Sequence, residues 1–143
     1  MSKQSPFLPR KRARRFALQT LYGWLLSEND LRDIEKHALI EHADVDFDRD
    51  YFLLLLHEVP RQTHDLDLLM TPYLSRKLED LGPIELTILR ISIYELKERP
   101  EIPYKVIINE GLELAKTFAS SDSHKFVNGV LDKVARDLRK TEI

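Results

Sequence analysis

Residues 83–98 read PIELTILRISIYELKE and place apolar side chains on every face of the helix that they predict. These apolar positions are Ile84, Leu86, Ile88, Leu89, Ile91, Ile93 and Leu96. A helix that is apolar all round has no face suited to water and must lie within a core. Gly82 stops any preceding helix, and Pro83 suits a first helical turn, whose backbone N–H groups need no intrahelical acceptor. We therefore expect residues 83–98 to form the central helix of an all-helical fold.

Downstream of this segment, two more helices are predicted by apolar residues at three- and four-residue steps. Pro100 and Pro103 bound a short loop before a helix over residues 103–118. The cluster Ser120-Ser121-Asp122-Ser123 offers caps for a last helix that continues to about Arg139.

Upstream, the same periodicity predicts helices over residues 10–27 and 30–43, the second with Asn29 and Asp30 available as caps. An apolar helix follows from Tyr51, and Pro60 is expected to kink or split it. A short helical piece from Arg76 to Leu81 is expected before Gly82. Together these segments predict an all-α fold, a compact bundle of about seven helices.

Length and composition restrict the class of protein. At 143 residues and 43% hydrophobic content, the chain has the size of one domain, so we expect a single domain over residues 1–143. The absence of cysteine excludes disulfides and thiolate metal sites and fits a reducing compartment. No window approaches the roughly 20 apolar residues of a membrane span, and the N-terminus lacks the apolar stretch of a signal peptide. We expect a cytoplasmic protein that does not bind membranes.

Candidate catalytic groups are scarce. The five histidines are scattered without the spacing of a zinc site, and four glycines form no phosphate-binding loop. Capping explains the serines near residue 120 better than nucleophilic catalysis does. We therefore expect no catalytic residue, no metal site, no cofactor and no enzymatic activity.

The charge of the chain is distributed unevenly. Residues 1–15, here called the basic arm, contain no acid and six cations, namely Lys3, Arg10, Lys11, Arg12, Arg14 and Arg15. The remaining residues carry 16 bases against 24 acids. Concentrated positive charge is typical of a polyanion site, although a solubilising tail or an address signal has the same composition. Cations at a helix N-terminus oppose the helix dipole, which favours a functional origin for the arm.

Two aromatic residues fall at the edges of predicted helices. Tyr22 lies on a different stripe from Trp24, and Phe126 follows Lys125. A ring beside a cation suits stacking on single-stranded nucleic acid, whereas ordinary core packing is the alternative for both residues.

Several stretches carry a resemblance to a known family. They are LRISIYEL at 89–96, IPYKVIINE at 102–110, AKTF at 115–118 and DSHKFVNGVLDK at 122–133, preceded by RRFALQTLY at 14–22 and PYLSR at 72–76. In this order they closely resemble the bacterial NusB family of transcription antitermination factors. The resemblance covers nearly the whole chain, while residues 28–50 match only in character.

The resemblance implies an all-α protein of two helical subdomains that pairs with NusE, a small-subunit ribosomal protein. The pair is expected to bind boxA RNA in nascent ribosomal RNA leaders. With other Nus factors and RNA polymerase, it is expected to suppress premature termination. The resemblance leaves a homodimer and a monomer equally open, and self-association could bury the basic arm.

The same resemblance implies roles for particular residues. RNA contacts are implied for Tyr73 and for two groups of residues. The first group, in the basic arm, is Arg10, Lys11, Arg12 and Arg14, and the second, near residue 124, is Asp122, Lys125 and Phe126. Tyr73 is expected to lie beside the second group. Contacts with NusE are implied for Tyr22 and Glu85, although an acid in a first helical turn is favourable to the helix dipole in any case. Lys11 stands where arginine is more usual, which keeps the charge but loses bidentate hydrogen bonding.

Two other classes of function remain open at this point. NusB-like domains also occur as RNA-binding accessory domains of ribosomal RNA methyltransferases, but the chain contains no cofactor-binding βαβ unit. A purely structural helical protein with a solvated basic tail is the other alternative, and it predicts no salt-dependent affinity for RNA.

Overall fold

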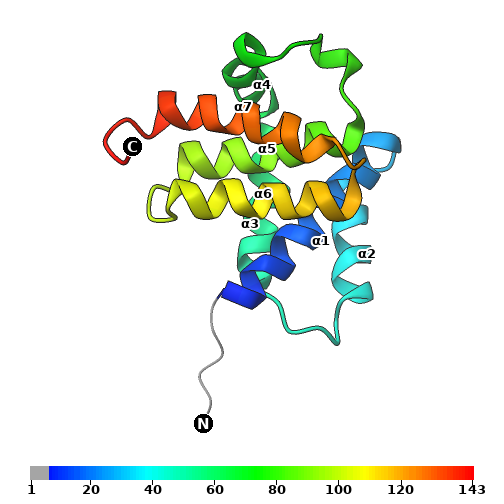
Figure 1. Ribbon diagram of the computed structural model, residues 1–143. Helices are drawn as coiled ribbons and strands as arrows, with labels where there is room; N and C mark the ends of the chain where they lie inside the picture. The colour runs from blue at the N-terminus through cyan, green and yellow to red at the C-terminus, as the bar shows by residue number, and fades with distance from the viewer. Residues whose placement is uncertain (1–6) are drawn as a thin grey trace. The chain divides into compact units, whose positions relative to one another are not determined.

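The computed structural model describes residues 7–143, and the regular elements in this range are all helical (Figure 1). Lys3 of the basic arm lies outside the described residues. In chain order the elements are α1 Phe7–Leu26, α2 Leu31–Glu41, α3 Arg49–Arg61, α4 Thr63–Met70, the 3-10 turns η1 Thr71–Tyr73 and η2 Leu78–Asp80, α5 Pro83–Glu98, α6 Tyr104–Phe118 and α7 Ser123–Leu138. The predicted all-α class with about seven helices is confirmed, and none of the described helices is long and apolar enough to cross a membrane.

The chain divides into two compact units, residues 1–60 and 61–143. The boundary coincides with Pro60, which lies in the last turn of α3. Proline has no N–H for the helical hydrogen bond and its ring clashes with the preceding turn, so α3 ends at Arg61 and α4 begins at Thr63. The predicted split at Pro60 is confirmed, and the two units are the two helical subdomains of the predicted fold.

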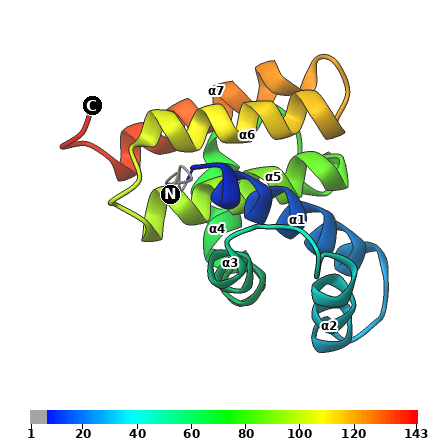
Figure 2. The same cartoon turned by 90° about the horizontal axis from the view of Figure 1, so that it is seen from below.

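A chain of aromatic rings holds the first unit together. The rings of Phe16 in α1 and His42 after α2 are stacked with centroids 3.6 Å apart. Phe47 meets Phe16 edge-on at 5.0 Å and Phe52 of α3 at 5.8 Å. Figure 2 shows α1 and α2 as neighbours in this unit. Because these rings come from both sides of the loop at residues 42–48, that loop is attached to α1 and α3 along its length.

The central helix of the second unit is α5, as the sequence predicts. Ten of its sixteen residues are buried, and it packs against α4, α6 and α7. Figure 2 shows α6 and α7 lying side by side. Gly111 of α6 allows this close packing, because a Cβ atom there would lie 2.8 Å from Ser92 Oγ and 3.1 Å from Leu131 Cδ1.

Arg139, at the C-terminus of α7, forms hydrogen bonds with the C-terminal end of α5. Its guanidinium, 6% exposed, donates to four backbone carbonyls, those of Glu95, Leu96, Arg99 and Ile102, at 2.8–3.3 Å. The last carbonyls of a helix lack intrahelical donors, and a planar group with five N–H donors can satisfy several at once. Arg139 also donates to Glu142 at 2.5 Å.

Two local predictions need correction. The helical piece expected before Gly82 is only the turn η2, because Leu81 and Gly82 are extended ahead of Pro83, and a residue before proline avoids helical backbone angles. Asp122 does not cap α7, since its own backbone is helical and an N-cap side chain needs an extended residue. Asp30 does cap α2, accepting a 2.8 Å hydrogen bond from the N–H of Arg32.

Replacing Gly111 by alanine is expected to destabilise the fold by about 1–2 kcal/mol. Overpacking against Ser92 and Leu131 typically costs about 1–3 kcal/mol, and the gain in helix propensity of up to about 1 kcal/mol offsets part of it. The control is Gly129→Ala in α7, where no atom lies within 4 Å of the new Cβ and propensity alone predicts stabilisation. Urea denaturation of both variants checks the opposite signs; stabilisation by Gly111→Ala, as expected for Gly129→Ala, would contradict this reading of Gly111.

Protonation of the Glu142 carboxylate is expected to lower the stability of the fold in acid. The backbone N–H of Tyr104 donates to it at 2.8 Å and, with Arg139, lowers the pKa of Glu142 below its ordinary value of 4.5. Because the pKa of Glu142 is lower in the folded chain than in the unfolded chain, the ionised carboxylate stabilises the fold at a pH above the ordinary pKa. This stabilisation is lost as the pH falls and the carboxylate is protonated. The Tm difference between the natural chain and Glu142→Gln should therefore shrink below about pH 4.5, whereas Glu79→Gln, at an exposed acid, serves as the control for charge loss.

Candidate nucleic-acid interface

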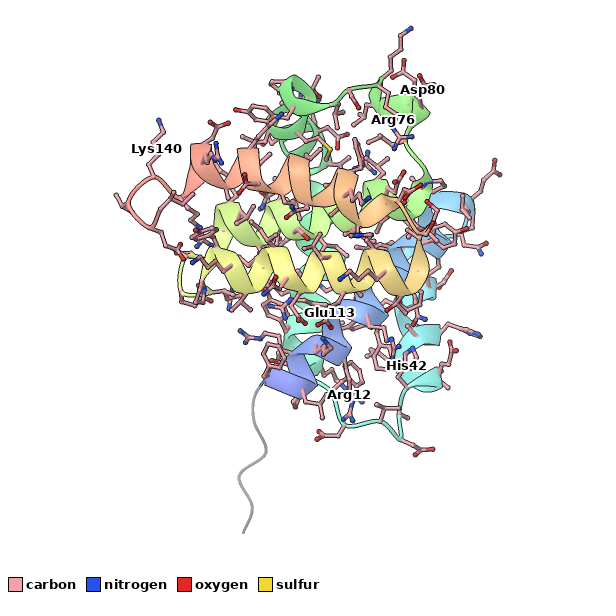
Figure 3. All side chains as sticks on the ribbon, in the orientation of Figure 1. Arg12, His42, Arg76, Asp80, Glu113 and Lys140 are labelled. Atoms are coloured by element: carbon pink, nitrogen blue, oxygen red, sulfur yellow. The ribbon has the colours of Figure 1, made fainter. Side chains whose placement is uncertain are left out.

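The described cations of the basic arm lie on the first turns of α1, in the first unit. Arg10 Nη2 lies 3.5 Å from Asp48 Oδ2, and the guanidinium sits 4.2 Å from the centroid of the Tyr51 ring. Arg12 Nη1 donates to the carbonyl of Asp46 at 2.8 Å. Figure 3 shows Arg12 beside the loop that joins α2 and α3. The described part of the arm, residues 7–15, is therefore helical and held against that loop.

This contact changes the electrostatics that composition suggests. Residues 44–50 contain four aspartates and one arginine, and their attachment to α1 brings negative charge next to the cations. Nothing in the composition of residues 44–48 indicates which helix they contact, so the sequence does not reveal this compensation. The positive field of the arm is thus partly compensated within the same unit.

Arg14 and Arg15 differ sharply in accessibility. The side chain of Arg14 is 2% exposed and lies 5.6 Å from the Tyr51 ring, so it cannot reach a phosphate in this conformation. Arg15, to which the prediction gave no role, is exposed. Buried Ala17 and Leu18 follow Arg14 by three and four positions, but Leu18 also follows Arg15 by three positions, so helical periodicity alone does not separate the two arginines.

The start of α7 forms a second group, in the second unit. Asp122 and Lys125 are exposed, and Phe126 is half-buried. The guanidinium of Arg76 lies 4.6 Å from the centroid of the Phe126 ring, and its Nη2 lies 3.4 Å from Glu85 Oε1. Arg76, to which the sequence assigned no role, therefore contacts both Phe126, which is predicted to bind RNA, and Glu85, which is predicted to contact the protein partner.

The two predicted partner contacts belong to different units. Tyr22 of α1 is half-buried. Glu85 is 9% exposed and accepts from the N–H of Gly82 at 3.3 Å, as an acid at the third position of a helix often does. Glu85 therefore has a structural role at the start of α5, in addition to any contact that its remaining exposed surface makes.

Tyr73 is not located where the prediction placed it. Its hydroxyl donates to the carboxylate of Asp137, and this bond raises the pKa of Tyr73 above its ordinary value. Asp137 follows Lys125 by twelve residues, about 18 Å along α7 at 1.5 Å per residue. The expectation that Tyr73 lies beside Lys125 and Phe126 is wrong, because η1 packs against the far end of α7.

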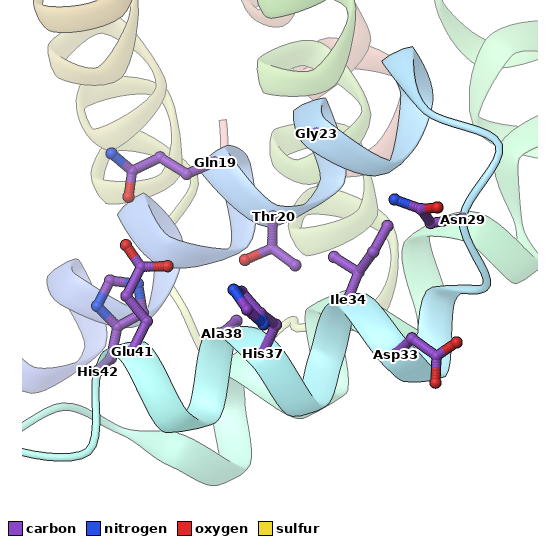
Figure 4. Close-up of a pocket in the computed structure, with 10 residues that line it drawn as sticks. All are labelled: Gln19, Thr20, Gly23, Asn29, Asp33, Ile34, His37, Ala38, Glu41 and His42. Atoms are coloured by element: carbon purple, nitrogen blue, oxygen red, sulfur yellow. The ribbon is translucent and has the colours of Figure 1, made fainter.

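A groove with both polar and apolar lining residues lies between α1 and α2 in the first unit (Figure 4). Gln19 and Thr20 line it from α1, and Asp33, His37 and Glu41 line it from α2. None of the predicted RNA or partner contacts lines this groove. Within residues 7–143, no three histidine, aspartate or glutamate side chains are grouped closely enough to hold a metal ion.

Comparison with known proteins identifies related chains. The model of the NusB family matches residues 11–136. The chain is 55% identical over 131 residues to the transcription antitermination protein NusB of Yersinia pestis (strain Pestoides F), covering 92% of this chain and 95% of the relative. The NusB protein of Yersinia pseudotuberculosis serotype O:1b gives the same values.

Two solved structures are also similar. T. maritima NusB is 28% identical with a TM-score of 0.78, covering 94% of this chain and 96% of that one. A crystal structure of the antitermination factors NusB and NusE in complex with dsRNA contains a chain that is 26% identical, with a TM-score of 0.80 and coverage of 89% and 96%.

Truncation of buried Arg14 is expected to lower the free energy of unfolding, whereas truncation of exposed Arg15 is expected to change it little. Arg14→Ala removes a buried side chain packed near Tyr51 and should destabilise the fold by about 1–3 kcal/mol. Arg15→Ala, at an exposed position one residue later, should change stability by less than about 0.5 kcal/mol. Urea denaturation measures both values, and equal effects would show that the two arginines do not differ in their structural role.

Proposed function

Because this chain belongs to the NusB family, we propose that it is a transcription antitermination factor that binds RNA together with the ribosomal protein NusE. The observation that carries the proposal is the 55% identity, over 92% of the chain, to proteins named for this function. The solved NusB–NusE complex with RNA, whose NusB-like chain is 26% identical, supports the two partners.

Two kinds of RNA contact are proposed. Arg10 and Lys11 are part-exposed cations suited to phosphates, which position a nucleic acid without reading its sequence. Arg12 binds phosphate in the same way once its side chain no longer donates to the carbonyl of Asp46. Arg14 is buried and stabilises the arm by packing beneath it. Lys125 and Phe126 provide a second cation and a ring on which an unpaired base can stack.

We propose single-stranded boxA RNA in nascent ribosomal RNA leaders as the ligand. A ring at a helix edge can stack only on a base that is unpaired, and phosphate contacts alone discriminate poorly between sequences. Asp122, which is exposed and does not cap α7, has acceptor oxygens available for a base edge. Tyr73, at the other end of α7, would meet a different part of the RNA.

NusE completes the proposed complex. Tyr22 is half-exposed, and Glu85 retains limited exposed surface, so these residues can contribute to a protein interface. With other Nus factors and RNA polymerase, the complex would suppress premature termination. This role requires binding rather than turnover.

A binding titration tests the proposal. Labelled boxA RNA should bind more tightly to the chain with NusE than to the chain alone, and more tightly than a scrambled RNA of equal length, because the cations of the arm supply mainly sequence-independent attraction. Equal affinity for boxA and scrambled RNA in the presence of NusE would contradict the proposal.

A matched pair of variants tests the contribution of α7. Lys125→Ala should weaken RNA binding and reduce the slope of log Kd against log salt by about 0.7, the value for one phosphate contact on a single strand. Lys133→Ala, which removes the same charge from an exposed position on the same helix, should leave the slope unchanged. A similar loss in both variants would remove the start of α7 from the RNA surface.

A further inference from the structure

Asp48 lies next to the cations of the basic arm and is fixed there by several contacts. Its backbone N–H donates to the carbonyl of Pro9 at 3.0 Å, which attaches it to the first turn of α1. Its Oδ1 accepts from the N–H of Tyr51 at 3.0 Å and so caps the start of α3. The other oxygen, Oδ2, lies 3.5 Å from Arg10 Nη2. A carboxylate is thus fixed beside the guanidinium of the first described arginine.

Arg10 has a second support that does not depend on Asp48. Its guanidinium lies 4.2 Å from the centroid of the buried Tyr51 ring, which favours a flat cation on its face. The side chains of Arg10 and Asp48 are 32% and 30% exposed, so solvent and large anions can reach both. Loss of the carboxylate would therefore leave Arg10 in place with more of its donors available.

A phosphate oxygen and a carboxylate oxygen seek the same donors of a guanidinium. RNA that binds at Arg10 must share those donors with Asp48 or displace it, and it also meets the repulsion of the carboxylate. The arm is therefore a weaker anion site than its composition suggests.

We propose that Asp48 limits non-specific RNA binding by acting as an internal substitute for phosphate at Arg10. By reducing the attraction of the arm for any nucleic acid, the carboxylate keeps the protein less occupied by unrelated RNA at a given concentration. This inference rests on the proposed RNA-binding function. It concerns the sequence-independent part of that function, which the chain has without NusE.

The expected size of the effect follows from the exposure of the pair. Solvent-exposed ion pairs contribute little, so removal of the carboxylate should tighten binding by about two- to fivefold at low salt. Salt screens such a pair, and the gain should decline toward none at about 1 M salt. A uniform gain for every RNA leaves the ratio of affinities unchanged but raises the fraction of protein that unrelated RNA occupies at a given concentration.

The test compares Asp48→Asn with Asp44→Asn, both in the chain without NusE. Asparagine keeps an oxygen that can cap α3, and Asp48→Ser provides a second capping residue without charge. Asp44 is exposed in the same loop, so its substitution changes the net charge equally. Thermal unfolding confirms that each variant is folded, and the readout is the Kd for scrambled single-stranded RNA at several salt concentrations.

The proposal expects Asp48→Asn and Asp48→Ser to bind scrambled RNA about two- to fivefold more tightly at low salt, with a smaller gain for Asp44→Asn. The gain should disappear when Arg10 is replaced by glutamine, because the carboxylate acts through that side chain. Equal gains at positions 44 and 48, no gain at position 48, or a gain that persists without Arg10 would each overturn it. Equal affinity for boxA and scrambled RNA in the presence of NusE would instead contradict the proposed function. That measurement uses NusE, whereas the test of Asp48 is made without it, so the two outcomes are distinguished.

Discussion

The burial of α5 is the constraint on which the second unit depends. A helix with apolar side chains all round its axis must be enclosed, and α4, α6 and α7 pack against it. Enclosure removes water from the C-terminal carbonyls of the helix, which then need other donors. Arg139 provides them, so the end of α7 is tied to the end of α5. Gly111 permits the close approach of α6 that this enclosure requires.

The same packing positions the proposed contact residues of the second unit. Because α5 and α7 are neighbours, Glu85 in the first turn of α5 and Phe126 in the first turn of α7 both contact Arg76. The opposite end of α7 carries the bond between Tyr73 and Asp137. The proposed RNA contacts of this unit therefore lie at two ends of one helix rather than in one cluster.

In the first unit, aromatic packing decides how the basic arm is presented. The rings of Phe16, Phe47 and Phe52 attach the loop at residues 42–48 to α1 and α3. That attachment places Asp46 and Asp48 against the arginines and puts Tyr51 beneath two of them. The described part of the arm is consequently a helical surface whose positive charge is partly compensated by aspartates of its own unit.

Periodicity and composition alone determined the helical class, the central position of α5, the break at Pro60 and the concentration of cations at the start of the chain. These features depend on interactions between near neighbours in the chain and on whether a helix has a polar face. Only the tertiary structure decided that Arg14 is buried while Arg15 is exposed, that Asp48 meets Arg10, and that Tyr73 lies far from Phe126 along α7. These outcomes depend on contacts between residues 38 or more positions apart, or on which helical face the packing covers, and local sequence patterns do not encode either. The basic arm was therefore visible in the sequence, but which of its cations can reach RNA was not.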